Sequence, residues 1–391
     1  MKFEYIIPTK SLWQIAFRPF FLFGSIYSIF IVYFWISFYS GNFKINNYYN
    51  VVNWHAHEMI FGFVIAIVTG FIFTASANWT AKEPLKFFRL KLLFFFWIVP
   101  RILSFICKEK NIIIMFFDLF FYLLLIYYLY NYFSIENQRK NRIFILLFFF
   151  IFISNFIIHL EIFGFLENFS RKAIMIALSS ILMMITIITG RIIPFFTKKA
   201  ILEEKIEVKE WIEKYLFILS FLFIITNSFF ESKVINSLVC FLLTFLHFER
   251  FRNWHPIQTA KIPILWILFI GYFWFILGFF MKGISLFLDI SYSLSTHLLT
   301  LGGMSVIIYG MITRVSLGHT GRPIVASKVI VLAYYIINLS VFIRVFIPLF
   351  LSNYTKLAIN ISGFLWILVF SIFIFKYWKI LVSPRIDGLS N

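Results

Sequence analysis

The strongest constraint on this chain is its hydropathy pattern, in which apolar runs of membrane-spanning length follow one another with only short polar segments between them. Hydrophobic residues make up 61% of the 391 residues and charged residues only 13%, whereas soluble domains carry roughly 25% charged residues. About 20 apolar residues suffice for a helix to cross a bilayer. The sequence therefore predicts an all-α polytopic membrane protein, a single transmembrane domain over residues 1–391 that lies in a lipid bilayer. Twelve spans are predicted, near residues 16–39, 56–78, 87–106, 111–133, 142–160, 173–196, 212–230, 233–248, 263–281, 293–313, 328–350 and 357–378.

The net charge of +18 is a topology signal, and nucleic acid is not predicted as a partner. With the N-terminus placed in the cytoplasm, the inner segments hold 25 of the 35 Lys and Arg residues. This bias follows the positive-inside rule. It predicts a multi-pass membrane protein with both termini in the cytoplasm. At the inner surface, Arg18 opens the first span and is expected to reach the lipid headgroups, while His247 and His255 are expected to be solvated.

An internal repeat runs through the chain at intervals of 120 residues. Gly70, Gly190 and Gly310 occupy its equivalent positions, and the residues thirteen positions earlier are His57, Ala177 and His297. Repeats of fixed period are the sequence signature of stacked or arrayed architectures. The spacing predicts three pseudo-repeats of four helices, near residues 10–135, 136–255 and 256–380, and it suggests that the two histidines are paired ligands.

Small residues predict how the second span packs. On an ideal helix Gly62, Ala66 and Gly70 form one stripe, and such stripes let membrane helices approach closely. His57 points away from this stripe, and His297 stands in a similar relation to Gly302 and Gly310. His55 points nearer the packing side, so a different role is expected for it.

Four histidines converge at one depth of the membrane. The direction of each span places His55, His57, His159 and His297 in the zone of the outer leaflet. A single histidine is more often a helix cap or the partner of a carbonyl group. Four at one depth favour metal chemistry, because imidazole is a common ligand of iron and copper.

Two arginines suggest that one cofactor is haem. Arg101 and Arg344 lie in the third span of the first and third repeats, next to the spans that carry His57 and His297. Arginine suits bidentate pairing with carboxylates, so these residues are predicted to bind haem propionates. The alternative for Arg101 is an ion pair with Asp118, since buried charges in membranes usually pair.

Several motifs are spread along nearly the whole chain: Phe17-Arg18-Pro19-Phe20-Phe21, Trp54-His55-Ala56-His57-Glu58-Met59, Asn78-Trp79-Thr80, Gly190-Arg191 with Pro194-Phe195-Phe196-Thr197, and Met311 to Arg322. Through these motifs the chain resembles the NnrS family of bacterial membrane proteins. The resemblance implies a haem- and copper-containing inner-membrane protein linked to denitrification, to nitric oxide metabolism and to tolerance of nitrosative stress. Two positions depart from the family pattern: Phe269 stands where a histidine is frequent, and Ala81 where a glycine is common.

The predicted architecture also resembles the catalytic subunit of haem-copper oxidases, whose twelve helices form three four-helix arcs with haem ligands on the second and tenth helices. The resemblance implies that His57 and His297 are the axial ligands of a haem b, which leaves His55 and His159 for copper or for hydrogen bonds. The oxidase copper also needs histidines on the sixth and seventh helices, and these spans have none.

Three functions compete at this stage. The first is a haem b protein, with copper as a further cofactor, that binds nitric oxide or its metal-nitrosyl products. The second is a transporter of a small solute, since internal repeats and charges within the membrane occur in transporters too. The third is an assembly partner of respiratory complexes without a cofactor of its own. The sequence does not distinguish an enzyme from a binding protein.

Overall fold

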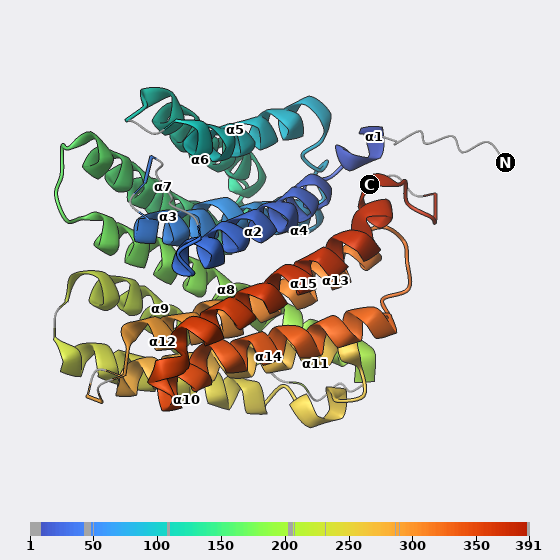
Figure 1. The fold of residues 1–391 in the computed structure, drawn as a ribbon. Helices are drawn as coiled ribbons and strands as arrows, with labels where there is room; N and C mark the ends of the chain where they lie inside the picture. Colours follow the sequence, from blue (N-terminus) through green and yellow to red (C-terminus); the bar gives the residue numbers. More distant parts are fainter. Residues whose placement is uncertain are drawn as a thin grey trace. The chain divides into compact units, whose positions relative to one another are not determined.

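The computed structural model describes residues 9–42, 48–49, 51–107, 110–201, 206, 208–230, 232–285, 287–288 and 290–388. These residues form helices, turns and loops and contain no strand, as predicted (Figure 1). The long helices are α2 (Phe17–Tyr39), α5 (Phe87–Ile106), α6 (Ile112–Phe133), α7 (Arg142–Phe163), α8 (Ser170–Ile201), α9 (Glu210–Phe229), α10 (Lys233–Arg252), α11 (Pro263–Ile284), α14 (Lys328–Phe350) and α15 (Thr355–Val382).

Two further long helices are compound. The first joins α3 (Val51–His57), a π-helical segment (Glu58–Val64) and α4 (Ile65–Thr80). The second joins α12 (Tyr292–His297), a π-helical segment (Leu298–Ser305) and α13 (Val306–Gly318). The N-terminal turn α1 (Thr9–Leu12) and the short 3₁₀ segments Glu136–Asn141, Pro256–Thr259 and Ser352–Tyr354 complete the helical elements of the described residues.

All twelve predicted spans are helical. Eleven of these helices are long and apolar enough to cross a membrane. The other is α5, which carries three charged residues, Arg89, Lys91 and Arg101. The multi-pass helical fold is thus confirmed, whereas the crossing by α5, and with it the count of twelve, stays a prediction. The extreme ends of the chain, whose side of the membrane the sequence predicts, lie outside the described residues.

The chain divides into two compact units. Unit 1 comprises residues 1–171, 312–324 and 370–391, and unit 2 comprises residues 172–311 and 325–369. The helices α13 and α15 therefore contribute their C-terminal parts to unit 1. The three pseudo-repeats stay a prediction.

In unit 1 the small-residue stripe lets α2 pack closely along the compound helix of residues 51–80 (Figure 1). A Cβ atom on Gly62 would lie 2.6 Å from a ring carbon of Tyr27, and one on Gly70 would lie 3.0 Å from the Cβ atom of Phe20. Both positions therefore need glycine for the two backbones to approach, as the sequence predicts. The compound helix also packs against α6.

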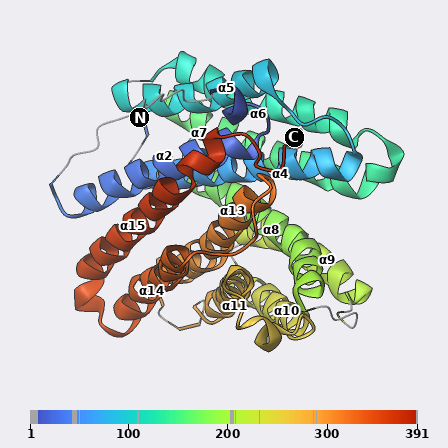
Figure 2. The ribbon, with the colours of Figure 1, turned by 90° about the vertical axis from the view of Figure 1, so that its right-hand side faces the viewer.

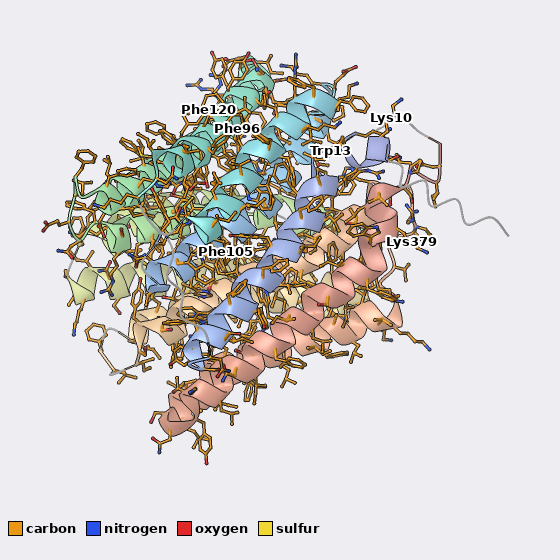
Figure 3. All side chains as sticks on the ribbon, turned by 45° about the horizontal axis from the view of Figure 1, so that its top comes forward. Lys10, Trp13, Phe96, Phe105, Phe120 and Lys379 are labelled. Atoms are coloured by element: carbon orange, nitrogen blue, oxygen red, sulfur yellow. The ribbon has the colours of Figure 1, made fainter. Side chains whose placement is uncertain are left out.

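Aromatic side chains join α5 to α6 in the same unit. Phe96 of α5 and Phe120 of α6 have ring centroids 4.6 Å apart (Figure 3). Trp97, the next residue on α5, faces the compound helix and donates from its Nε1 atom to the carbonyl oxygen of Gly62 at 3.0 Å. This hydrogen bond places Arg101, one turn after Trp97, beside the compound helix.

Asn111 caps the N-terminus of α6. Its side-chain oxygen accepts a hydrogen bond from the amide of Ile113 at 2.9 Å.

In unit 2 the helices α10 and α11 lie side by side (Figures 1 and 2). The expectation that His247 is solvated is wrong: its side chain is 0% exposed, and its Nδ1 atom lies 2.5 Å from the hydroxyl of Tyr272 on α11. Burial follows from packing, because α11 covers the face of α10 that carries this residue. His255, after the end of α10, is half-buried.

Candidate metal centre

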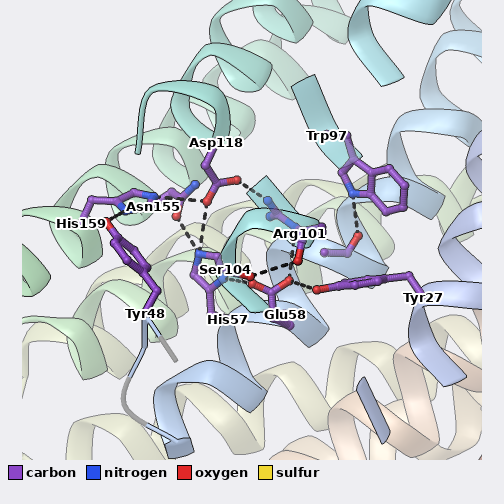
Figure 4. A network of polar contacts seen from close by, with 11 residues as sticks. Tyr27, Tyr48, His57, Glu58, Trp97, Arg101, Ser104, Asp118, Asn155 and His159 are labelled. Carbon is purple, nitrogen blue, oxygen red and sulfur yellow. Dashed lines mark hydrogen bonds and ion pairs between the residues drawn. The ribbon is translucent and has the colours of Figure 1, made fainter. Parts of the chain in front are cut away.

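The centre lies in unit 1, where two histidines meet one aspartate (Figure 4). The Nε2 atom of His159, on α7, lies 3.2 Å from Oδ2 of Asp118 on α6. The Nε2 atom of His57, at the end of α3, lies 3.5 Å from the same oxygen. The three ligand atoms lie within 4.8 Å of one another, and the side chains are 0–1% exposed. Two imidazoles and a carboxylate in this arrangement can hold a metal ion.

The outer nitrogen of each histidine has its own partner. Nδ1 of His57 lies 2.9 Å from Oε1 of Glu58, and Nδ1 of His159 lies 3.0 Å from the hydroxyl of Tyr48. A carboxylate can only accept, so His57 carries a proton on Nδ1. A phenol both donates and accepts, so Tyr48 can accept the equivalent proton of His159. Metal-bound histidines are held in this way, with the ligating nitrogen turned inward.

Tyr48 stays protonated at this position. Burial, and after it the negative charge of Asp118, raises the pKa of its phenol. The hydroxyl is therefore available to His159 throughout the physiological range. Tyr49, the next residue, stacks on the ring of His57 with centroids 4.2 Å apart. These two tyrosines cover the histidines from the segment that leads into α3.

Arg101 balances the carboxylates. Its Nη1 atom lies 2.5 Å from Oδ1 of Asp118, and its Nε atom lies 3.2 Å from Oε2 of Glu58. Tyr27 of α2 donates to the same oxygen of Glu58 at 2.5 Å. The expected pairing of Arg101 with Asp118 is therefore observed. A role of Arg101 as a propionate partner stays a prediction, and it requires the guanidinium to leave these two carboxylates.

The charges of the cluster leave one unit of negative charge when both histidines are neutral, because one guanidinium faces two carboxylates. Burial of uncompensated charge is costly. In the metal-free centre His57 supplies the balance. Both of its ring nitrogens face oxygen atoms, Oε1 of Glu58 and Oδ1 of Asn155, the latter at 2.9 Å. This arrangement suits an imidazolium, whose Nε2 proton a bound metal ion would replace.

His55 faces the packing side of its helix, as its position predicts. Its ring stacks on Trp35 of α2, with centroids 4.2 Å apart and planes at 17°. The side chain therefore faces α2, the packing helix. A role of His55 as a copper ligand stays a prediction.

The other two predicted residues come together in unit 2. Nη2 of Arg344, on α14, lies 3.4 Å from both ring nitrogens of His297 and donates to the hydroxyl of Ser293 at 3.1 Å. Nδ1 of His297 also lies 2.7 Å from the carbonyl oxygen of Ser293. Because His57 belongs to unit 1 and His297 to unit 2, their pairing across one haem stays a prediction.

Sequence reasoning treated Asp118 only as a partner of Arg101 and gave Asn155 and Tyr48 no role. One signal was available: Asn155 and His159 are four residues apart on α7 and so share a helix face. The Nδ2 atom of Asn155 is buried and makes no hydrogen bond within the described part of the chain, while its Oδ1 atom faces His57. Asn155 is therefore a candidate fourth ligand through oxygen.

Fold and site together define a polytopic helical membrane protein with a buried histidine–aspartate–histidine centre. The sequence matches the family described as NnrS protein over residues 11–385, nearly the whole chain. The chain therefore belongs to the NnrS family, as its motifs predict. No curated protein matches it at a significant level.

Proposed function

We propose that this protein is a metal-binding protein of the bacterial inner membrane that acts in nitric oxide metabolism or in tolerance of nitrosative stress, with a metal ion held by His57, Asp118 and His159. The observation that carries the proposal is the orientation of the two imidazoles. Glu58 and Tyr48 bind the outer nitrogens, and both Nε2 atoms face one carboxylate oxygen of Asp118. The role in nitric oxide chemistry rests on family membership.

The donor set fits copper or iron. Imidazole suits both metals, and two histidines with one carboxylate are a known iron-binding set. With both histidines neutral, one guanidinium and two carboxylates leave the cluster with one negative charge. A monovalent copper ion that replaces the proton of His57 would therefore leave the buried centre neutral. A metal ion held by these residues would supply the chemistry for binding a small ligand such as nitric oxide. The residues of the chain hold that ion, exclude water and keep the imidazoles in one tautomer.

Haem b is proposed as a separate cofactor. Support comes from the register that His57 and His297 share and from the contact between His297 and Arg344. The contacts of His57 within unit 1 favour a small ion at its Nε2 atom. Haem content and bound copper must therefore be measured independently.

The transporter alternative predicts helices that are broken near the midplane of the membrane. The compound helices of residues 51–80 and 292–318 are widened by π-helical turns, yet each continues without a break. This observation favours a packed cofactor site over a transport pathway.

The test is metal analysis of the purified full-length protein, together with absorption spectra of its oxidised and reduced forms. We expect bound copper or iron that is lost in His159→Gln and in Asp118→Asn. The matched control is His255→Asn, which removes an imidazole far from the centre in sequence. Asparagine tolerates the left-handed backbone of that position, where φ is 55°. Equal metal content in all of these proteins contradicts the proposed centre.

A further inference from the structure

Arg18, predicted to reach the lipid headgroups, is instead buried at the beginning of α2. Its side chain is 0% exposed. Its Nη1 atom donates to the carbonyl oxygens of Leu381 at 2.8 Å and Ser383 at 2.5 Å. These carbonyl groups lie at the C-terminus of α15, where the helix dipole favours a cation. These hydrogen bonds satisfy Nη1, one of the three nitrogens of the guanidinium.

The other two nitrogens of the Arg18 guanidinium have no hydrogen-bond acceptor among the described residues. Nε and Nη2 of Arg18 are buried and make no hydrogen bond within the part of the chain that the structure describes. A buried charged group without an acceptor is costly, and inside a membrane protein such a group points to a functional site. The donors of Arg18 therefore call for an acceptor that is not part of the described chain.

The surroundings of Arg18 are also cationic. Arg322 and Arg385 are close enough to act on its charge. Asp387 neutralises Arg385 through two hydrogen bonds, at 2.9 and 2.6 Å. Among the described residues, the guanidinium of Arg322 donates only to the carbonyl oxygen of Thr320, at 3.3 Å. Among the described residues, neither Arg18 nor Arg322 forms an ion pair with a carboxylate, because Asp387 pairs with Arg385.

An imidazole completes the donor set. The ring of His319 lies 5.8 Å, between centroids, from Phe17, the residue before Arg18. Its nitrogens make no hydrogen bond with other described residues. Burial, and after it the charge of Arg385, lowers the pKa of His319 to about 4. The neutral ring therefore offers one N–H donor without adding a further positive charge.

The chain segments at this place are fixed to one another. Gly321 has φ +74°, and a Cβ atom there would lie 2.6 Å from the carboxylate carbon of Asp387, so the position needs glycine. The amide of Ile386 donates to the carbonyl oxygen of Thr320 at 3.2 Å. The turn after α13 and the segment after α15 are therefore held together beside the start of α2. Lys10 and Lys379 lie toward the same end of this unit (Figure 3).

We propose that this end of unit 1 binds an oxyanion of the phosphate type between Arg18, His319 and Arg322. The planar fork of a guanidinium matches the oxygens of a phosphate group and can bind two of them at once. The place lies where α2 begins and α15 ends, at the boundary of two membrane spans, which is the level of lipid headgroups. The headgroup of an acidic phospholipid and free phosphate share this chemistry.

The experiment uses the full chain and has two arms. In the first, binding of radiolabelled inorganic phosphate is measured by equilibrium dialysis of the detergent-purified protein. In the second, the protein is placed in nanodiscs of phosphatidylcholine with or without phosphatidylglycerol, and native mass spectrometry counts the acidic lipids that remain bound. The variants are Arg18→Gln and Arg322→Gln. The control is Arg139→Gln, which removes the same charge from an exposed arginine of unit 1.

We expect both variants to weaken binding at least about tenfold relative to the control, since each removes a charge-assisted donor. Loss in the phosphate arm identifies a free oxyanion as the ligand. Loss in the phosphatidylglycerol arm alone identifies a lipid headgroup. If Arg18→Gln does not fold, Arg322→Gln decides, because that side chain is only partly buried. Binding in Arg322→Gln equal to that of the control, in both arms, overturns the proposal.

Discussion

His57 and His297 each stand immediately before a π-helical segment, Glu58–Val64 in one case and Leu298–Ser305 in the other. The two histidines are 240 residues apart, so the widened turns occupy equivalent places in the sequence. The helix between them, α8, carries Ala177 at the equivalent position and is α-helical throughout. Segments of π-helix are rare and are frequent at functional sites. The π-helical turn therefore occurs at the two equivalent positions that carry histidine and not at the one that carries alanine.

In unit 1 the widened turn places Glu58 between three partners. Its carboxylate contacts His57 at 2.9 Å, Arg101 at 3.2 Å and Tyr27 at 2.5 Å. In the other widened turn the equivalent residue is Leu298, and no carboxylate follows His297. The two sites thus differ in charge although they share a backbone geometry. This difference agrees with a small cation beside His57 and a separate cofactor at His297.

The first prediction concerns the packing of this turn. Gly62→Ala places a methyl group 2.6 Å from a ring carbon of Tyr27 and 2.9 Å from Oε2 of Glu58. We expect the substitution to destabilise the protein by about 1–3 kcal/mol, as overpacking does, and to lower metal content because Glu58 moves away from His57. Thermal unfolding in detergent and metal analysis measure both effects. Gly318→Ala is the control, since its nearest neighbour lies 3.4 Å away; equal losses in the two variants contradict the prediction.

The second prediction concerns the charge of the centre. Arg101→Gln leaves Asp118 and Glu58 without their guanidinium, and breaking a buried pair in this way costs about 3–5 kcal/mol. We expect a large drop in thermal stability. Arg89→Gln, an exposed change on the same helix, should have little effect. The double variant Arg101→Gln with Glu58→Gln restores the balance and should regain part of the stability; a double variant less stable than the single one argues against this account.

Hydropathy made the helices and the pairing of Arg101 with Asp118 predictable, because spans need apolar residues and charges inside them need partners. The centre could be predicted only in part. The contact of His159 with Asp118 depends on how α6 and α7 pack. His57 faces Asn155 and is followed directly by a π-helical segment, whose residue positions an ideal helical wheel does not reproduce. Arg18 meets carbonyl groups 363 and 365 residues away, a contact that no local pattern records.

A third prediction follows from proton competition. Metal binding requires a neutral His57, so the ion displaces the proton that otherwise balances the two carboxylates. The apparent affinity should therefore rise with pH, by about tenfold for each pH unit while one proton is displaced. Copper titration of the metal-free protein between about pH 6 and pH 8 measures the slope. A flat dependence shows that the centre is already unprotonated without metal.

The fourth prediction concerns the helix α5. If α5 crosses the membrane, Ala81 lies on the cytoplasmic side and Lys110 on the periplasmic side, and a reporter after Asn391 is cytoplasmic. Fusions of a periplasm-active reporter after each residue test the three positions. We expect activity only after Lys110. Equal activity after Ala81 and Lys110 means that α5 does not cross, and activity after Asn391 contradicts the even number of spans.

The last prediction separates haem from the small ion. Four single variants, His55→Ala, His57→Ala, His159→Ala and His297→Ala, are scored for haem content, for the reduced spectrum and for copper or iron outside haem. We expect His297→Ala to lose the haem and His57→Ala to lose the small ion, because Nδ1 of His57 is bonded to Glu58 and only its Nε2 atom is left to hold a metal ion. Loss of haem in His57→Ala as well would support the axial pair that the repeat register predicts. Arg344→Ala should weaken haem retention, because its guanidinium lies beside His297. His159→Ala should lose the small ion and keep the haem, since its Nε2 atom faces Asp118. His55→Ala should keep both, because the ring of His55 stacks on Trp35.

If His57→Ala loses only the small ion while His297→Ala loses the haem, His57 belongs to the centre of unit 1 alone and the axial pair is wrong. If His55→Ala loses haem while His57→Ala keeps it, the repeat register does not identify the ligand.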